Sequence, residues 1–312
     1  MKTWNQSTVT EFIILGFPST KHIQILLFIS FLFTYILTIL GNITLLVTLQ
    51  REPRLRTPMY FFLSTLYVLE IGYTSVTVPK LLSVFLNRDR AISLSACLVQ
   101  SYFFFLLGST ECFLLAAIAY DLYLAICNPL RYPALMSSKM CIQLALFCCV
   151  TGFLNPCLPT FLVSRLKFCG SIINLFFCDV PPLLSLSCTD AYVSATTIFI
   201  SSSIIVLGSF LMTSLSYTCI LVTILKMTSS KGCQKAFSTC TYHLTVVSLY
   251  YGTVIFMYTS PEAQKSMKVN KVVSVVYSVG TPMLNPIIYS LRNEDVKKTL
   301  RKMLLNMFPA RK

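Results

Sequence analysis

The chain has 312 residues, of which 55% are hydrophobic, 13% aromatic and only 12% charged, and its mean hydropathy is +0.73. Soluble domains carry about 25% charged residues, and 11 Asp and Glu cannot solvate the surface of a soluble protein of this size. The same numbers exclude a disordered chain, a collagen and a small disulfide scaffold. A polytopic membrane protein remains, in which a net charge of +14 indicates basic segments at the membrane surface rather than nucleic-acid binding.

Seven apolar stretches are predicted to cross the membrane. A spanning helix needs about 20 mostly apolar residues, and backbone groups in lipid must be satisfied within their own segment, which favours helices. The predicted spans are residues 23–49, 57–79, 91–130, 140–164, 191–225, 236–261 and 272–291. We therefore expect an all-α membrane protein, with a seven-transmembrane helix bundle at 23–291 between an N-terminal tail at 1–22 and a C-terminal tail at 292–312.

The distribution of Lys and Arg predicts the orientation, because cytosolic segments carry an excess of both. With the N-terminus outside, the cytosolic segments hold 15 basic and four acidic residues, and the outer segments hold nine and five. We expect an extracellular N-terminus in a multi-pass protein of the plasma membrane. Nothing before residue 23 resembles a cleavable signal peptide, so the first helix is expected to insert as an uncleaved anchor. Asn5-Gln6-Ser7 is then a usable glycosylation acceptor at Asn5.

The C-terminal tail is predicted to form a short amphipathic helix that lies on membrane lipids. Apolar residues recur at helical spacing among basic ones, as is typical of interfacial helices. These apolar residues are Val296, Leu300, Met303, Leu304 and Met307.

Four of the 13 cysteines fall in the predicted outer segments. Cys97 begins the third span, whereas Cys169, Cys178 and Cys188 lie in the long loop after the fourth. Disulfides form outside the reducing cytosol. Four cysteines allow three pairings, and the sequence does not choose among them.

Five short motifs follow one another along the chain. They are GN at 41–42, PMYFFL at 58–63, AYDLYLAIC at 119–127 followed by NPLRY at 128–132, KAFSTC at 235–240, and PMLNPIIY at 282–289. This set, in this order, resembles the odorant receptors, a family of rhodopsin-like G-protein-coupled receptors. The resemblance implies a small odorant as ligand, a heterotrimeric stimulatory olfactory G protein as partner, a rise in cAMP as the signal, and the disulfides Cys97–Cys178 and Cys169–Cys188.

Other classes of membrane protein fit the sequence less well. A transporter typically has inverted repeats and broken helices, and although Pro156, Pro159 and Pro286 could break helices, neither half of the chain repeats the other. An enzyme needs a catalytic constellation, but His22 and His243 fall near opposite membrane faces, with no serine elbow or metal-ligand spacing. A receptor is favoured over an enzyme, with a transporter or channel as the alternative.

Helical spacing predicts the ligand pocket. Phe104, Gly108 and Cys112, with Phe105 and Ser109 beside them, form one broad stripe of the third helix. Such a stripe is equally typical of helix packing, but the resemblance implies that it faces the odorant cavity. The same is implied for residues of the fifth and sixth helices: Ser201, Ser202, Ile205, Tyr251, Ile255, Tyr258 and Glu262. This lining suits a small, mostly hydrophobic ligand, and Glu262 at the rim favours alcohols, ketones and esters over fatty acids.

Two acidic residues, Glu70 and Glu111, fall in the middle of predicted spans, where a charge costs several kcal/mol. The resemblance places both beside Asn285, where related receptors hold a sodium ion in the resting state. Glu70 stands where the family usually has Asp, which changes the geometry of that site. The alternative is a pair of protonated, hydrogen-bonded glutamic acids without an ion. No other cofactor is expected.

The cytosolic end departs from the family at the end of the third helix and at Tyr242, where the family usually has serine before His243. The third helix normally ends in Asp-Arg-Tyr, but here it reads Asp121-Leu122-Tyr123. Leu122 can pack but cannot form an ion pair, so the main alternative function is a receptor-like protein with weak or absent G-protein coupling. The resemblance assigns roles in activation to further residues: Tyr217, His243, Asn285, Pro286 and Tyr289.

Overall fold

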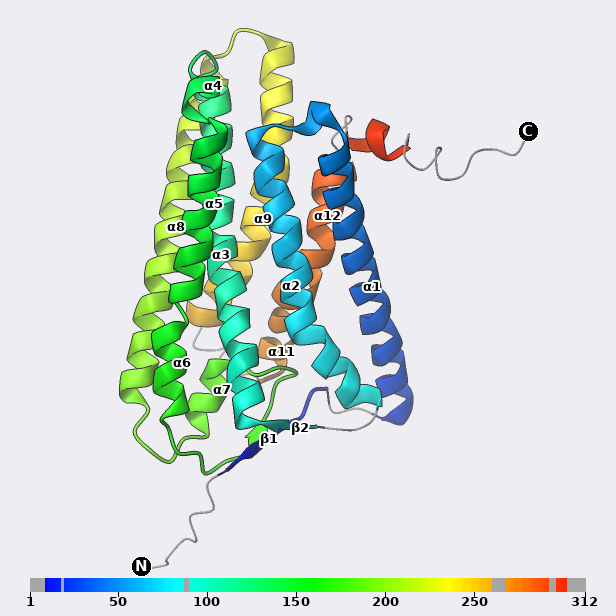
Figure 1. Ribbon diagram of the computed structural model, residues 1–312, viewed down its shortest axis with the longest axis vertical. Coiled ribbons are helices and arrows are strands. Elements are labelled where there is room, and N and C mark those ends of the chain that lie inside the picture. The colour runs from blue at the N-terminus through cyan, green and yellow to red at the C-terminus, as the bar shows by residue number, and fades with distance from the viewer. Residues whose placement is uncertain (1–8, 18–19, 87–89, 260–266, 292–295, 302–312) are drawn as a thin grey trace, which may run out of the picture.

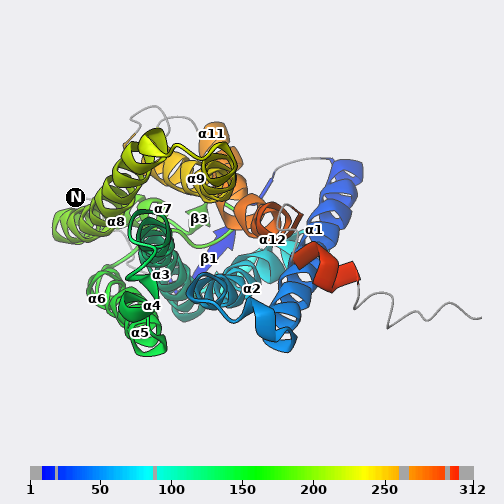
Figure 2. The same ribbon diagram turned by 90° about the horizontal axis from the view of Figure 1, so that it is seen from above.

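The computed structural model describes residues 9–17, 20–86, 90–259, 267–291 and 296–301. Within these ranges, seven long helical segments run side by side in one elongated bundle (Figure 1). They are α1 (Lys21–Arg51), α2 (Pro58–Leu86), α3 (Leu94–Cys127), α5 (Ser138–Leu154) with α6 (Cys157–Ser164), α8 (Tyr192–Lys226), α9 (Ser230–Thr259), and α11 (Met267–Val275) with η2 (Val276–Gly280) and α12 (Thr281–Leu291). Seen along the bundle, α3 packs against α2, α5 and α8 (Figure 2).

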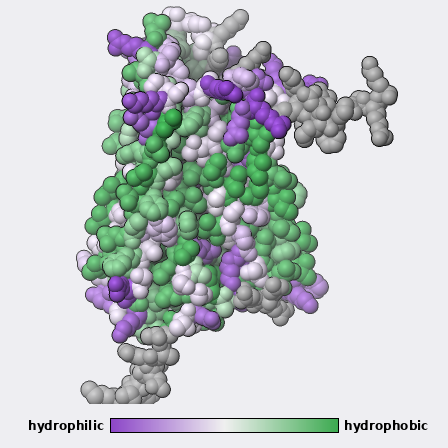
Figure 3. All heavy atoms as spheres, viewed as in Figure 1, coloured by the Kyte–Doolittle hydropathy of each residue, from purple (hydrophilic) through white to green (hydrophobic). Residues whose placement is uncertain are grey.

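The surface of the bundle suits a lipid bilayer. Among the described residues, α1, α2, α3, the α5–α6 pair and α8 are each long and apolar enough to cross a membrane. Figure 3 shows an apolar belt around the middle of the molecule, with hydrophilic residues gathered at its two ends. Large apolar side chains of the spanning helices are exposed, for example Phe33 of α1 and Ile204 of α8, as expected where lipid rather than water is the solvent. The predicted all-α membrane fold is confirmed.

The fourth and seventh predicted spans depart from a regular α-helix within their length. The fourth is interrupted between α5 and α6 at Asn155 and Pro156, because proline lacks the amide hydrogen that an α-helix needs and its ring clashes with the preceding turn. The seventh contains one π-helical turn, η2, before α12, and such turns are often found at functional sites. The helices also extend past several predicted bounds, because charged residues such as Lys21 and Arg51 limited the apolar stretches but are compatible with helix.

A small sheet lies at one end of the bundle, although no strand was predicted (Figure 1). The strand β1 (Glu11–Ile14) pairs antiparallel with β2 (Ala91–Ser93) and parallel with β3 (Ile172–Ile173). The third predicted span therefore begins as a strand, and its helix starts only at Leu94. The disulfides Cys97–Cys178 and Cys169–Cys188 lie at this end, as the resemblance implied. We call it the disulfide end.

The opposite end carries the short connections η1 (Pro53–Leu55) and α4 (Tyr132–Leu135). Residues 296–301 are also helical here (Figure 1). Val296 is buried and Leu300 partly buried against the bundle, while Lys297 and Lys298 are exposed. These two apolar side chains therefore contact the protein, whereas the prediction placed them on the lipid-facing side of the helix. The other predicted apolar positions of the tail, Met303, Leu304 and Met307, lie outside the described residues.

Candidate functional site

A cavity of about 60 Å³ lies inside the bundle toward the disulfide end, and we call it the inner cavity. Seven of the residues predicted to bind ligand line it: Phe104, Phe105, Gly108, Ser109, Cys112, Ser202 and Ile205. Seven further lining residues were not predicted: Tyr73, Asn155, Val206, Tyr250, Val254, Met257 and Tyr277. The lining is mostly apolar and comes from α2, α3, α8, α9, η2 and the break between α5 and α6.

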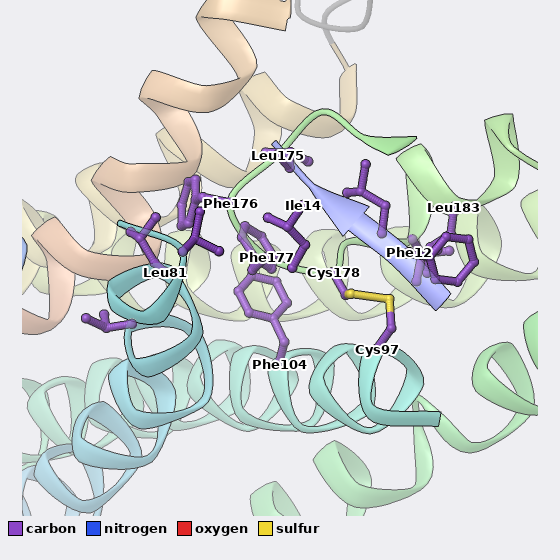
Figure 4. Close-up of a cluster of buried hydrophobic side chains, with 14 of the residues drawn as sticks. Phe12, Ile14, Leu81, Cys97, Phe104, Leu175, Phe176, Phe177, Cys178 and Leu183 are labelled. Carbon is purple, nitrogen blue, oxygen red and sulfur yellow. A yellow bond between two sulfur atoms is a disulfide. The ribbon is translucent and has the colours of Figure 1, made fainter. Parts of the chain in front are cut away.

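Aromatic rings close the inner cavity toward the disulfide end. The ring of Phe104 lies 4.7 Å from that of Phe177 and 4.9 Å from that of Tyr73, measured between centroids. Phe177 is fully buried, as are Phe12 and Ile14 of β1 in the same hydrophobic cluster. Figure 4 shows Phe177 against Phe104, beside the Cys97–Cys178 disulfide. The sheet and the loop thus form an apolar cover over the cavity.

The loop that carries Phe177 is fixed to the bundle through Cys178. Besides its disulfide to Cys97, the Cys178 amide donates a hydrogen bond to Gln100 Oε1 at 2.9 Å, and its carbonyl accepts one from Ser101 Oγ at 2.6 Å. Gln100 Nε2 donates in turn to the Val76 carbonyl on α2 at 2.8 Å. The position of the cover therefore depends on contacts with both α2 and α3.

The next residue, Asp179, begins α7 (Val180–Ser185) inside the same cover. Its carboxylate accepts a hydrogen bond from the Val180 amide at 2.8 Å, which satisfies one of the free amides at the start of that helix. Asp179 is only 2% exposed, and burial raises the pKa of its carboxyl to about 6.

Tyrosines of α9 form the floor of the inner cavity. The Tyr250 hydroxyl donates to the Gly108 carbonyl at 2.7 Å and lies 3.4 Å from Cys112 Sγ. Tyr251 is almost fully buried behind this wall, where its hydroxyl donates to the Cys112 carbonyl at 3.2 Å. Between α3 and the break after α5, Asn155 Nδ2 donates to Ser109 Oγ at 2.8 Å. Two tyrosines thus connect α9 directly to the backbone of α3.

Some predicted pocket residues do not line the inner cavity. Tyr251 lies behind it, Ser201 bonds back to the Ile198 carbonyl of its own helix, and Ile255 lines a neighbouring cavity. The side chain of Tyr258 and all of Glu262 lie outside the described residues, as does Asn5. Tyr250, Val254 and Met257 have the same helical spacing as the predicted set, one position earlier along α9, so spacing alone does not choose between the two faces.

A polar cluster occupies the centre of the bundle. Asn285 Nδ2 donates a hydrogen bond to Glu70 Oε1, and Glu111 lies close enough to Glu70 for their charges to interact. Within the described part of the chain, Glu70 Oε2 and Glu111 Oε1 are buried and have no hydrogen-bond partner. Two unpartnered carboxylate oxygens beside an amide are suitable ligands for a hard cation such as sodium.

Residues predicted to act in G-protein coupling lie at the opposite end of the bundle. Asp121 Oδ1 accepts a hydrogen bond from the Tyr132 hydroxyl at 2.9 Å. Leu122 is 5% exposed and belongs to an apolar cluster with Tyr217 of α8 and Cys240 of α9. The cluster also includes residues of α1, α2 and α5, and Leu122 brings no charged group to it.

The remaining predicted residues are placed as follows. Tyr217 and His243 share a hydrogen bond of 2.7 Å between the hydroxyl and Nδ1, and their rings stack. Tyr123 is half-buried beside Tyr120, and Pro286 packs next to Gly41 of α1. The side chain of Tyr289 lies outside the described residues.

Comparison with known proteins gives one consistent result. Residues 31–307 match the family model described as "Olfactory receptor". The chain is 50% identical to human olfactory receptor 11L1, over 97% of this chain and 95% of that protein. It is 46% identical to human olfactory receptor 6N1, over 97% and 98%, and 46% identical to rat olfactory receptor 226, over 95% and 92%.

Proposed function

Because the chain belongs to the olfactory receptor family, we propose that it binds a small, neutral, mostly hydrophobic odorant in the inner cavity. The family makes it a G-protein-coupled membrane receptor rather than an enzyme. The contact of Tyr250 with Gly108 carries the proposal for this site. This hydroxyl lines the cavity and joins α9 to α3, so a ligand that displaces it changes the contact between two helices that both reach the opposite end.

The chemistry of the lining supports a neutral ligand. The walls are largely aromatic and aliphatic, and the polar groups among them are hydroxyls, a thiol and the amide of Asn155. A ligand carboxylate would lose its hydration here without gaining a cationic partner among the described lining residues. We therefore rank alcohols, ketones and esters above fatty acids.

For the partner and the orientation, we propose an extracellular disulfide end and a stimulatory olfactory G protein that binds the opposite end and raises cAMP. Disulfides form in oxidising compartments, and both bonds lie at the disulfide end. The opposite end carries the exposed basic residues Lys297, Lys298 and Arg301, as the positive-inside rule requires of a cytosolic face at the plasma membrane.

For the polar cluster, we propose a sodium ion in the resting receptor, held by Glu70, Glu111 and Asn285. The two unpartnered carboxylate oxygens support this assignment. A bound cation would supply the positive charge that lets both carboxylates stay ionised next to each other. Glu70 would then contact Asn285 and the ion together, which connects α2 to α12.

A second candidate function is a receptor-like protein that couples weakly to its G protein, because Leu122 stands where an arginine would contact that partner. The apolar cluster around this residue gives α3 no guanidinium to present to a G protein. An odorant panel with a cAMP readout and a surface-expression control tests both functions. A dose-dependent response to neutral members supports the first, and silence across the panel at normal surface levels supports the second. A carboxylic acid as the best agonist would contradict the ligand ranking.

A further inference from the structure

A second cavity, of about 340 Å³, lies beside the inner one and opens on the lipid-facing side of the bundle. We call it the lateral cavity. It lies between α7, α8 and α9, and its lining is almost entirely apolar: Val180, Pro181, Leu184, Ala195, Ile198, Phe199, Ser202, Ser203, Val206, Leu207, Val254 and Ile255. Ser202, Val206 and Val254 line both cavities, so these side chains form a shared wall between them.

The helical faces of α8 show how the lateral cavity joins lipid to protein. Phe199, Ser203 and Leu207 follow one another at intervals of four residues and share one face. Phe199 is 65% exposed and Leu207 61%, so this face meets the lipid. Ser202 and Val206 share the adjacent face, which meets the inner cavity. The lateral cavity therefore reaches from the bilayer to the wall of the proposed odorant site.

The inner cavity is too small for an odorant as it stands. One water needs about 10–15 Å³ of such volume, so about 60 Å³ accommodates only a few water-sized groups. A ligand must displace lining side chains, and protein interiors packed to crystal density resist this. The wall formed by Val206 and Val254 has empty space behind it, so it yields most easily. Toward the disulfide end, by contrast, Phe104 is covered by the fully buried Phe177.

We propose that the lateral cavity is an antechamber through which small, neutral, apolar molecules pass from the bilayer into the inner cavity, with Val206 and Val254 as the movable partition. The proposal rests on the inner cavity being the odorant site. The lateral cavity suits ligands that partition into lipid, because the cavity lining offers apolar contact and little hydrogen bonding. An odorant of this class is concentrated in the membrane before it reaches the receptor.

Access to the inner cavity is measurable without an agonist. The protein is the full-length receptor with Ser109→Cys in lipid nanodiscs. Position 109 lines the inner cavity and does not line the lateral one, so its thiol reports access to the inner cavity. The receptor is treated with methyl methanethiosulfonate, which is neutral and enters lipid, or with the trimethylammonium-ethyl analogue, which is cationic. Labelling at position 109 is followed by peptide mass spectrometry. We expect the cationic reagent to be about a hundredfold slower, given the cost of a charge in hydrocarbon.

Two obstructing variants and one matched control test the route. Ser203→Trp and Ala195→Phe each fill the lateral cavity from positions that do not line the inner one. Ile204→Trp places the same side chain at a neighbouring lipid-exposed position outside both cavities. We expect each obstructing variant to slow labelling by the neutral reagent by about tenfold, as an added barrier of about 1.4 kcal/mol would, while Ile204→Trp labels at the rate of the unobstructed reporter.

The outcomes separate this proposal from the proposed function. Equal rates for the two reagents, no labelling by the neutral one, or unchanged rates in both obstructing variants would each overturn the lateral route. Silence of the receptor toward every odorant would instead contradict the proposed odorant binding or the proposed G-protein coupling. The labelling rates depend on neither, so the two failures are distinguishable.

Discussion

The Tyr132 hydroxyl donates a hydrogen bond to Asp121 Oδ1 at 2.9 Å, so the acidic residue of the motif at the end of α3 is paired although the neighbouring arginine of the family is replaced by Leu122. Asp121 is 1% exposed. Burial and the adjacent Asp121 carboxyl raise the pKa of Tyr132, which keeps its proton available for donation. A neutral donor on α4 thus satisfies a buried carboxyl at the end of the bundle proposed to bind the G protein.

Tyr132→Phe removes that donor and should destabilise the receptor. A buried acceptor left without its partner costs about 1–3 kcal/mol, so we expect a lower melting temperature for the purified protein in detergent. Tyr192→Phe is the control, because Tyr192 is 72% exposed and the same hydroxyl is lost there from the surface. Equal melting temperatures for the two variants would show that the Asp121–Tyr132 bond contributes nothing.

Leu122→Arg should raise the maximal cAMP response without changing which odorants act. The guanidinium would lie next to Asp121 and would supply the charged contact that the natural protein lacks. A charged hydrogen bond contributes about 1.5–3 kcal/mol, or about ten- to a hundredfold in coupling. Leu122→Met preserves volume and polarity and should respond as the natural protein does. Equal maxima for all three proteins at matched surface levels would show that Leu122 permits full coupling.

Gly152→Ala should block folding and surface delivery, because at this glycine the backbone of α5 lies against α3 with no room for a side chain. An added Cβ would collide with Thr110 Oγ1 and would lie 2.9 Å from the Leu106 carbonyl oxygen, which is backbone and cannot move aside. Gly208→Ala on α8 is the matched control, since nothing lies within 4 Å of its added Cβ. The control should gain up to about 1 kcal/mol from helix propensity. Normal surface staining of Gly152→Ala would contradict the close packing.

Cys97→Ser should also prevent surface delivery, because it frees the loop that covers the inner cavity. A disulfide typically contributes about 2–4 kcal/mol, and this one also positions the hydrogen bonds from Cys178 to Gln100 and Ser101. Cys219→Ser, at an exposed free cysteine of α8, serves as the control and should reach the surface. Comparable staining of the two variants in unpermeabilised cells would count against this role of the bond.

The stability of the loop should fall as the pH rises, because of Asp179. Burial raises the pKa of this carboxyl from 3.8 to about 6, so the folded state holds the proton more tightly than the unfolded chain does. Between about pH 4 and 6 the folded state binds more protons, and its stabilisation is lost as the pH rises through this window, by an amount of the order of 3 kcal/mol.

Asp179→Asn should remove this dependence, since the amide oxygen can still accept from the Val180 amide. The measurement is the melting temperature from pH 4.5 to 7.5, with Asp190→Asn as the control for a change in the exposed part of the same loop. Parallel profiles for the natural protein and Asp179→Asn would show that the carboxyl titrates elsewhere.

Much of the candidate site followed from local pattern. The stripe of α3 that lines the inner cavity was predicted because five residues at spacings of three and four must share a helical face. The choice between Tyr250 and Tyr251 was not available from spacing, because both belong to apolar faces of α9. Their roles depend on the rotation of α9 against α3, in which the Tyr250 hydroxyl reaches the Gly108 carbonyl and the Tyr251 hydroxyl reaches the Cys112 carbonyl.

The sequence by itself determined the membrane class, the bundle of helices and the family, because hydropathy over about 20 residues and contiguous motifs are local properties. Only the tertiary structure decided the three-stranded sheet, the Asp121–Tyr132 bond and the lateral cavity. The sheet and the cavity join segments far apart in the chain, since β1 pairs with β2 and β3 across the disulfide end and α7, α8 and α9 enclose the cavity together. The Asp121–Tyr132 bond joins α3 to the separate helix α4. Such contacts depend on how the helices are oriented against one another, and hydrophobic periodicity does not encode that orientation.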